Sequence, residues 1–198
     1  MRKSSLLSFV VISFCFGVAC SKPGEQYFWS SRPVGSQNLY AIQYTTLGGV
    51  QKGKMVSRRE DDETINGARY VKTVSIYSGI PGAEPDISYC RMTGKGIYCL
   101  SSKHRDQPEY LKVPFPVTVG TTWTTISPEG ATDHKAESIE TVYLFDRTYD
   151  KCLKLSSTGT TDGIHFDATD YIAPGIGSVK SVMRFGSVTI EFDLENYS

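Results

Sequence analysis

Alternation of apolar and polar side chains, with no helical repeat competing with it, is the feature that most constrains the fold. Val188, Ile190, Phe192 and Leu194 are separated by polar residues, as in a strand with one buried face. No run of a dozen residues places apolar groups at the spacing of an amphipathic helix. Threonine, valine, isoleucine and aromatic residues are abundant, and glycine or proline recurs every few residues. We therefore predict an all-β domain.

Turn signals divide the chain into about ten short strands. The Asn66-Gly67 pair predicts a type I′ hairpin, because both residues accept a positive φ. Long open strand edges invite aggregation, so an antiparallel meander of this size is expected to close as a barrel or half-barrel. The candidate strands cover residues 39–47, 54–63, 68–77, 87–92, 97–101, 111–115, 123–126, 134–145, 152–157, 164–173, 177–185 and 188–194.

The first part of the chain has the layout of an export signal. Arg2 and Lys3 precede an apolar core over residues 6–16, and small residues lead up to Cys20. The core is too short to cross a bilayer as a helix, which takes about 20 apolar residues. Residues 17–20, Gly-Val-Ala-Cys, resemble the recognition box of bacterial lipoproteins, which implies cleavage before Cys20 and lipidation of its thiol. A secretory signal cleaved nearby without lipidation is the alternative.

The lipoprotein resemblance implies a domain organisation and a location. Residues 1–19 are the expected signal peptide, residues 20–38 a lipidated tether, and residues 39–198 the β-barrel-like domain. Ser21 follows the cysteine, which in similar enterobacterial lipoproteins implies sorting to the outer membrane. Two or three acyl chains, such as palmitate, attach a protein durably to a membrane. The expected location is therefore the bacterial cell envelope, with the lipid anchor as the membrane contact.

Charge argues against nucleic acid as a partner. Removal of residues 1–19 takes away Arg2 and Lys3, which leaves 19 basic and 21 acidic residues in the mature chain. The basic residues are scattered, apart from Arg58 and Arg59, which are followed by four acidic residues. The chain thus has no positive field that would hold a polyanion.

A hairpin in the middle of the chain brings two cysteines face to face. If Gly94 and Lys95 form a two-residue turn, Cys90 lies opposite Cys99 at a non-hydrogen-bonded position, where Cα atoms are about 4.5 Å apart. An oxidising envelope favours a disulfide there. A one-residue change of register would leave two buried thiols instead. Cys152 is expected to be a small core residue.

Several segments together resemble a broad group of uncharacterised bacterial exported proteins. That group is similar in build to the LolA/LolB-like lipoprotein carriers, in which a curved antiparallel sheet forms an open barrel around an apolar cavity. The resemblance implies this fold for residues 68–185 and carries over no catalytic residue. The matching segments are residues 66–70, 94–98, 113–123, 151–155 and 171–180.

The sequence contains no recognisable motif for catalysis, metal or cofactor binding. There is no GxSxG elbow, no phosphate-binding glycine loop, no HExxH and no CxxC. His165 and Asp167 share one face of a candidate strand, so a functional pair and a solvent-exposed pair both stay open. His134 is expected in a loop that leads into a strand, and His104 in a polar connection. We expect no catalytic residue, no metal site and no cofactor.

Aromatic residues are the one compositional excess, with twelve Tyr, nine Phe and two Trp. Many of them suit an ordinary β core, in which rings pair across strands. The alternative is a cavity for an apolar or glycan ligand, because a curved sheet of this size can enclose space that its side chains leave unfilled. The expected lining residues are Tyr70, Tyr89, Tyr98, Trp123, Tyr143 and Phe145.

Three functions are compatible with these features. The leading hypothesis is a non-enzymatic envelope lipoprotein that binds an apolar ligand or an envelope partner protein. A second hypothesis is a structural or assembly lipoprotein of a surface complex, which uses a sheet edge or the aromatic residues 27–29 of the tether. The third is a hydrolase of cell-wall or exported substrates.

Overall fold

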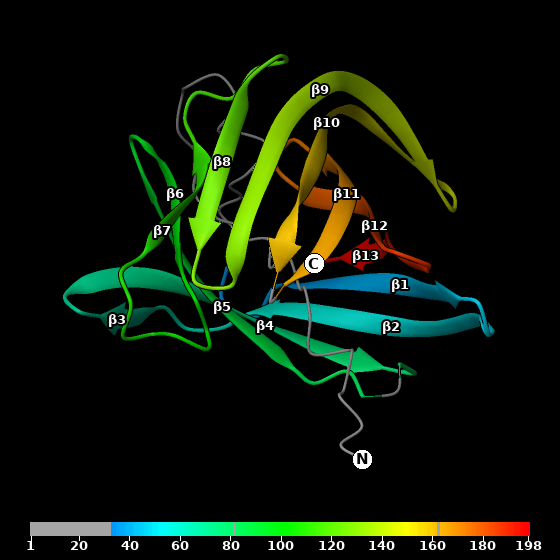
Figure 1. Cartoon of the computed structure of the whole chain (residues 1–198), viewed down its shortest axis with the longest axis horizontal. Coiled ribbons are helices and arrows are strands. Elements are labelled where there is room, and N and C mark those ends of the chain that lie inside the picture. The colour runs from blue at the N-terminus through cyan, green and yellow to red at the C-terminus, as the bar shows by residue number, and fades with distance from the viewer. Residues whose placement is uncertain (1–32, 81, 162) are drawn as a thin grey trace.

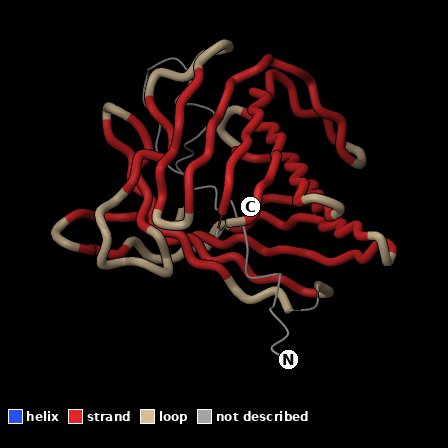
Figure 2. The backbone as a smooth tube through the Cα atoms, in the orientation of Figure 1, coloured by secondary structure: helices blue, strands red, loops and turns tan. Residues whose placement is uncertain are grey.

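Thirteen strands make up the domain in the computed structural model, which describes residues 33–80, 82–161 and 163–198. Figure 2 shows strands joined by turns, without a helix in the described part of the chain. The all-β prediction is therefore confirmed, with thirteen strands in place of about ten. They are β1 (Gln37–Thr46), β2 (Gly49–Arg59), β3 (Glu63–Ile65), β4 (Ala68–Ser78), β5 (Asp86–Thr93), β6 (Gly96–Leu100), β7 (Tyr110–Pro114), β8 (Thr122–Ser127), β9 (Gly130–Leu144), β10 (Arg147–Thr161), β11 (Ile164–Ala173), β12 (Gly177–Phe185) and β13 (Val188–Tyr197).

The strands form one antiparallel sheet that curls into a nearly closed barrel (Figure 1). Its order is β7-β6-β5-β4-β2-β1-β13-β12-β11-β10-β9-β8, and β3 is an additional partner of β4. The first and last strands of the chain pair with each other, since Ala41 of β1 lies opposite Asp193 of β13. Nearly all other neighbours are consecutive in sequence, as expected for a meander.

The two ends of the sheet, β7 and β8, meet at a seam that side chains bridge. The indole Nε1 of Trp123 donates a hydrogen bond to the carbonyl oxygen of Lys112 at 2.9 Å. The hydroxyl of Thr125 donates to the same oxygen at 3.0 Å. Both side chains come from β8 and reach across to β7, so two side-chain hydrogen bonds close the barrel where the backbone ladder of the sheet ends.

The two longest strands, β9 and β10, bend over the barrel (Figure 1). Their register shifts between Tyr149 and Cys152 and again between Lys154 and Leu155. Lys151, inside the first of these bulges, has a φ of 57°. Bulges of this kind increase the local twist and curvature of a strand pair, which allows one hairpin to follow the curve of the barrel.

The Asn66-Gly67 turn has the geometry predicted for it. Asn66 and Gly67 both have positive φ, 50° and 78°, as a type I′ turn requires. The single strand predicted over residues 54–63 is replaced by two, because β2 already begins at Gly49 and ends at Arg59, and β3 begins at Glu63. Between them Asp62 accepts hydrogen bonds from Arg59 at 3.0 Å and from Arg69 at 2.8 Å, and these ion pairs hold the chain in a bend.

The predicted disulfide is present. Cys90 lies opposite Cys99 in the register of β5 and β6, with a Cα–Cα distance of 4.1 Å. Both residues are fully buried within one core cluster that also contains Leu153 and Ile172. Cys152 is free and buried in a second core cluster, as expected for a small apolar residue.

The sheet begins slightly earlier than the predicted domain boundary at residue 39. Strand β1 starts at Gln37, and Asn38 is only 2% exposed. The Asn38 amide donates to the Tyr40 hydroxyl at 2.9 Å, and that hydroxyl donates to the carbonyl oxygen of Ser178 at 3.0 Å. Cys20 and the aromatic residues 27–29 lie outside the described residues.

Candidate functional site

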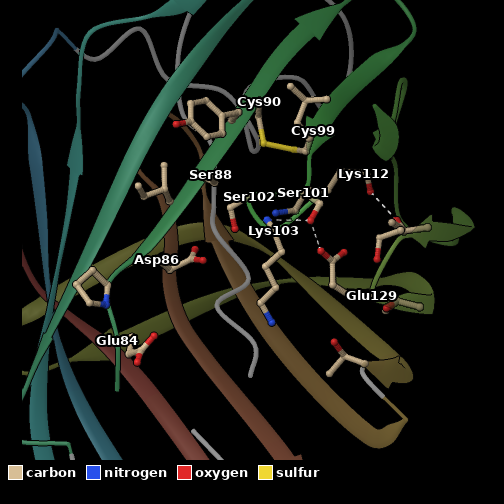
Figure 3. Close-up of a pocket in the computed structure, with 18 of the residues that line it drawn as sticks. Glu84, Asp86, Ser88, Cys90, Cys99, Ser101, Ser102, Lys103, Lys112 and Glu129 are labelled. Atoms are coloured by element: carbon tan, nitrogen blue, oxygen red, sulfur yellow. Dashed lines mark hydrogen bonds between the residues drawn. A yellow bond between two sulfur atoms is a disulfide. The ribbon is translucent and has the colours of Figure 1, made fainter. Parts of the chain in front are cut away.

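The barrel encloses a cavity of about 590 Å³. It lies toward the end of the barrel that carries the β4–β5, β6–β7 and β8–β9 connections, all of which contribute lining residues, as do Thr160 and Thr161 at the end of β10. Glu84, Lys103 and Arg105 in this lining are exposed, so the cavity reaches solvent here. Figure 3 shows Asp86, Lys103 and Glu129 around this space, with the Cys90–Cys99 bridge on one side of it. The volume is in the usual range for a small-molecule site.

One wall of the cavity is apolar. The alternation in β13 that dominates the sequence pattern turns Ile190 and Phe192 toward the interior, on the same face as the fully buried Leu194. Ile42 of β1, the neighbouring strand, and Ile80 after β4 line the same space. This wall would favour binding of an apolar surface through the hydrophobic effect.

The other wall is polar and comes from β5 to β9. Each of these strands, or the turn beside it, contributes at least one hydrogen-bonding side chain to the lining. The hydroxyl of Ser101 donates to the carboxylate of Glu129 across the cavity rim. The charged side chains of the lining all lie between Glu84 and His134 in the sequence, whereas Tyr44, Tyr77, Thr160 and Thr161 add only hydroxyls elsewhere. The two walls therefore differ in charge. The polar lining residues include Asp86, Ser88, Ser101, Lys112, Thr125, Glu129 and His134.

Lys112 brings a cationic group into the interior. Its side chain is half-buried, and it lines the cavity. Burial lowers the pKa of Lys112 to about 8, and the negative charges of Asp86 and Asp170 oppose this change. Protein surrounds the Lys112 side chain and desolvates its ammonium, although part of the side chain is open to the space inside the cavity.

Two carboxyl groups accompany Lys112. Burial raises the pKa of Asp86, with Lys112 opposing the rise. Burial also raises the pKa of Asp170 to about 6, and the nearby Ser181 hydroxyl and the charge of Lys112 oppose that rise. Asp170 is 3% exposed, and among the described residues its Oδ1 has no hydrogen-bond partner. Asp170 does not line the cavity, but Lys112 and Asp86 place ionisable groups of both signs at its wall, as is typical of binding sites.

His134 of β9 links the two strands that flank it, β8 and β10. Its Nδ1 lies 2.8 Å from the Ser157 hydroxyl and its Nε2 lies 3.1 Å from the Thr125 hydroxyl. Since Thr125 donates its own proton to the Lys112 carbonyl, it can only accept from Nε2–H, and Nδ1 is then the acceptor for Ser157. The Trp123 ring stacks on the imidazole with 4.9 Å between centroids. Burial, followed by the charge of Lys112, lowers the pKa of His134 to about 4.

This arrangement corrects the expectation for His134. His134 was expected where a loop leads into a strand that starts at residue 134, but β9 already starts at Gly130, so the residue lies inside the strand. No local motif marks His134 in the sequence. The only signal is its position two residues before the fully buried Ala136, because side chains two apart in a strand point to the same face.

The structure also corrects most of the aromatic residues expected to line the cavity. Tyr89 contributes to the lining, but Tyr70 and Tyr98 do not. Successive residues of a strand point to opposite faces, so the register that turns Cys90 inward directs Tyr89 away from the core cluster around the disulfide. Tyr70 and Tyr89 form a separate cluster with Leu100, and the Tyr70 hydroxyl donates to Glu109 at 2.7 Å.

The remaining three aromatic residues occupy other places. Trp123 belongs to the seam and packs against the core cluster around the disulfide. Tyr143 and Phe145 are 75% and 66% exposed, because Leu144 between them takes the inward position. They therefore lie on the surface, outside the cavity.

The other candidate pairs and motifs give little chemistry. His165 and Asp167 are 3.9 Å apart, with most of both side chains exposed, which fits the solvent-exposed alternative. Within the described residues no group of three His, Cys, Asp or Glu side chains could hold a metal ion. Over the same part of the chain, no helix has the length and hydrophobicity to span a membrane.

Comparison with known proteins identifies the fold. No protein-family model and no curated protein matches the chain. A structure from Bacteroides fragilis NCTC 9343, described as a "putative exported protein with YmcC-like fold", has a TM-score of 0.55 at 14% identity and covers 90% of this chain and 100% of its own. A "putative lipoprotein" from Parabacteroides distasonis ATCC 8503 has a TM-score of 0.47 at 12% identity, covering 91% of this chain and 100% of its own. The first likeness shows a shared fold. The relation to LolA/LolB-like carriers stays a prediction.

Proposed function

We propose that this protein is a lipid-anchored, non-enzymatic protein of the bacterial cell envelope that binds a small amphipathic molecule inside its barrel. The cavity of about 590 Å³ carries the proposal. It is of the size that encloses one small ligand, and its apolar wall supplies the driving force for burial. The export signal and Cys20 support the envelope location and the lipid anchor. The outer membrane is the proposed attachment site.

The arrangement of polar groups supports binding over hydrolysis. The Ser157 hydroxyl lies 2.8 Å from the His134 imidazole, as a nucleophilic serine and its base would. Ser157 is 5% exposed and does not line the cavity, so its hydroxyl is not presented to a substrate. His134 is held between two hydroxyls and stacked on Trp123, which suits a structural link between β8, β9 and β10. A hydrolase is thus the weaker proposal.

A second candidate function is docking of an envelope protein. Tyr143 and Phe145 form an exposed aromatic pair beside the turn between β9 and β10. Exposed aromatic residues are enriched in protein interfaces. The seam argues against the use of a free sheet edge, because β7 and β8 lie against each other.

The anchor is tested by removing its attachment point. Cys20→Ala should abolish metabolic labelling with a radioactive or clickable palmitate and should leave the protein either uncleaved or soluble. Lipidation requires the cysteine thiol, and no other mature cysteine follows a signal sequence. Labelling of the wild type that persists in Cys20→Ala, or no labelling of the wild type, would contradict the anchor.

The cavity is tested by filling it. Ile190→Trp places a larger ring on the apolar wall and should weaken uptake of the neutral fluorescent probe N-phenyl-1-naphthylamine at least tenfold. The matched control is Ile126→Trp, which adds the same ring at a position 73% exposed on β8. Equal probe affinity in the wild type and both variants would mean that the probe binds elsewhere.

A further inference from the structure

The polar wall of the cavity contains charges of both signs. Lys112 and Asp86 both line it, and each influences the pKa of the other. Desolvated charges are costly to keep in a fold, so a cavity that retains an ammonium and a carboxylate together is suited to a ligand that interacts with both. Glu129, whose carboxylate accepts a hydrogen bond from Ser101, and Lys103 at the exposed rim add a further negative and a further positive charge to the lining.

A ligand with a single charge would fit this wall poorly. An anion that approaches Lys112 meets the nearby carboxylate of Asp86, and a cation that approaches Asp86 meets the ammonium of Lys112. A zwitterionic head, with its anionic group on Lys112 and its ammonium on Asp86, places an opposite charge against each of them. Complementarity of this kind selects among ligands by penalising those that leave one group unpaired.

The opposite wall determines the rest of the ligand. Ile42, Ile190 and Phe192 offer an apolar surface with no charged side chain between them on the inward face of β1 and β13. The hydrophobic effect favours burial of a hydrocarbon chain against such a surface. The cavity has the volume of a site for one small ligand, which suits one chain with a compact head better than a lipid with two chains.

We infer that the ligand is a single-chain zwitterionic amphiphile, with a phosphate bound by Lys112, an ammonium bound by Asp86, and an acyl chain against Ile42, Ile190 and Phe192. This inference rests on the proposed ligand-binding function and narrows it to a class. Lysophosphatidylethanolamine is the simplest molecule with all three parts. A phosphate is preferred for Lys112 because an ammonium donates in three directions and phosphate oxygens accept in as many.

The test compares three probes with the same acyl chain on the full mature protein. They are lysophosphatidylethanolamine, lysophosphatidylglycerol, which lacks the ammonium, and monoacylglycerol, which lacks both charges; each displaces N-phenyl-1-naphthylamine below its micelle concentration. The wild type should bind the zwitterion at least tenfold more tightly than either other probe. Lys112→Met should weaken the binding of both phosphate-bearing probes and leave that of monoacylglycerol unchanged. Asp86→Asn should weaken only the zwitterion.

Matched controls are Lys95→Met and Asp106→Asn, which remove exposed charges away from the cavity lining. Both should keep the affinities of the wild type, and thermal melts establish that every variant is folded. Equal affinity for all three probes, or a preference that survives in Lys112→Met and Asp86→Asn, overturns the inference and leaves the cavity function intact. Failure of every probe, including the naphthylamine, overturns the cavity function itself.

Discussion

Replacing Cys90 and Cys99 together by alanine is expected to lower the free energy of unfolding by about 4 kcal/mol. The two residues are nine apart in sequence, and releasing a loop of that length accounts for about 3 kcal/mol in the chain-entropy model. Both side chains are also fully buried in the core cluster with Leu153, so loss of the sulfur atoms removes packing as well. For a domain of this size the melting temperature should fall by roughly 10 °C.

Reduction provides the independent control. Dithiothreitol should lower the melting temperature of the wild type and leave that of Cys90→Ala/Cys99→Ala unchanged. Cys152→Ala should still respond to the reductant, since Cys152 is a free buried thiol outside the bridge. A wild-type protein that mass spectrometry shows to be fully reduced, yet melts at an unchanged temperature, would refute the stabilising role of the bridge.

Acidification should destabilise the wild type relative to His134→Gln. The folded-state pKa of His134 is about 4, against 6.5 for an ordinary histidine, mainly because of burial. Between these two values the unfolded chain binds a proton that the folded chain refuses, so the free energy of unfolding falls as the pH falls. The difference amounts to about 3 kcal/mol. Glutamine can still donate to Thr125 and accept from Ser157 but does not titrate.

Comparison with the variant is needed because Asp170 acts in the opposite direction. Its folded-state pKa of about 6, raised from 3.8 by burial, stabilises the fold as the pH falls from 6 toward 3.8. The two effects nearly cancel in the wild type. Urea denaturation should therefore show that, from pH 7 to pH 4, the free energy of unfolding of His134→Gln rises by about 3 kcal/mol relative to that of the wild type. Parallel pH profiles for the two proteins would show that His134 is not the buried neutral group described here.

Local sequence rules predicted the parts of the fold that neighbouring residues determine. The Asn66-Gly67 turn requires two positive φ angles, and few other dipeptides accept them. The turn at Gly94 and Lys95 then sets the register that places Cys90 opposite Cys99. The alternation at the end of the chain likewise indicated which face of β13 is buried.

The candidate site depends on residues that are distant in sequence and could not be predicted in the same way. Asp86, Lys112 and His134 meet only because β5, β7 and β9 occupy neighbouring parts of a closed sheet. The inward or outward direction of each side chain depends on a register that bulges can shift. Tyr143 and Phe145 show the consequence, since a predicted cavity residue becomes a surface residue when its strand neighbour Leu144 takes the inward place.

Native mass spectrometry of the mature chain carrying Cys20→Ser, purified without added lipid and then offered lysophosphatidylethanolamine, tests the binding function most directly. The substitution removes the anchor, so any further mass belongs to a bound ligand. One equivalent of the single-chain amphiphile is expected on this protein, and it should be lost when Ile190→Trp is added. A bare polypeptide mass before and after the lipid is offered would contradict it.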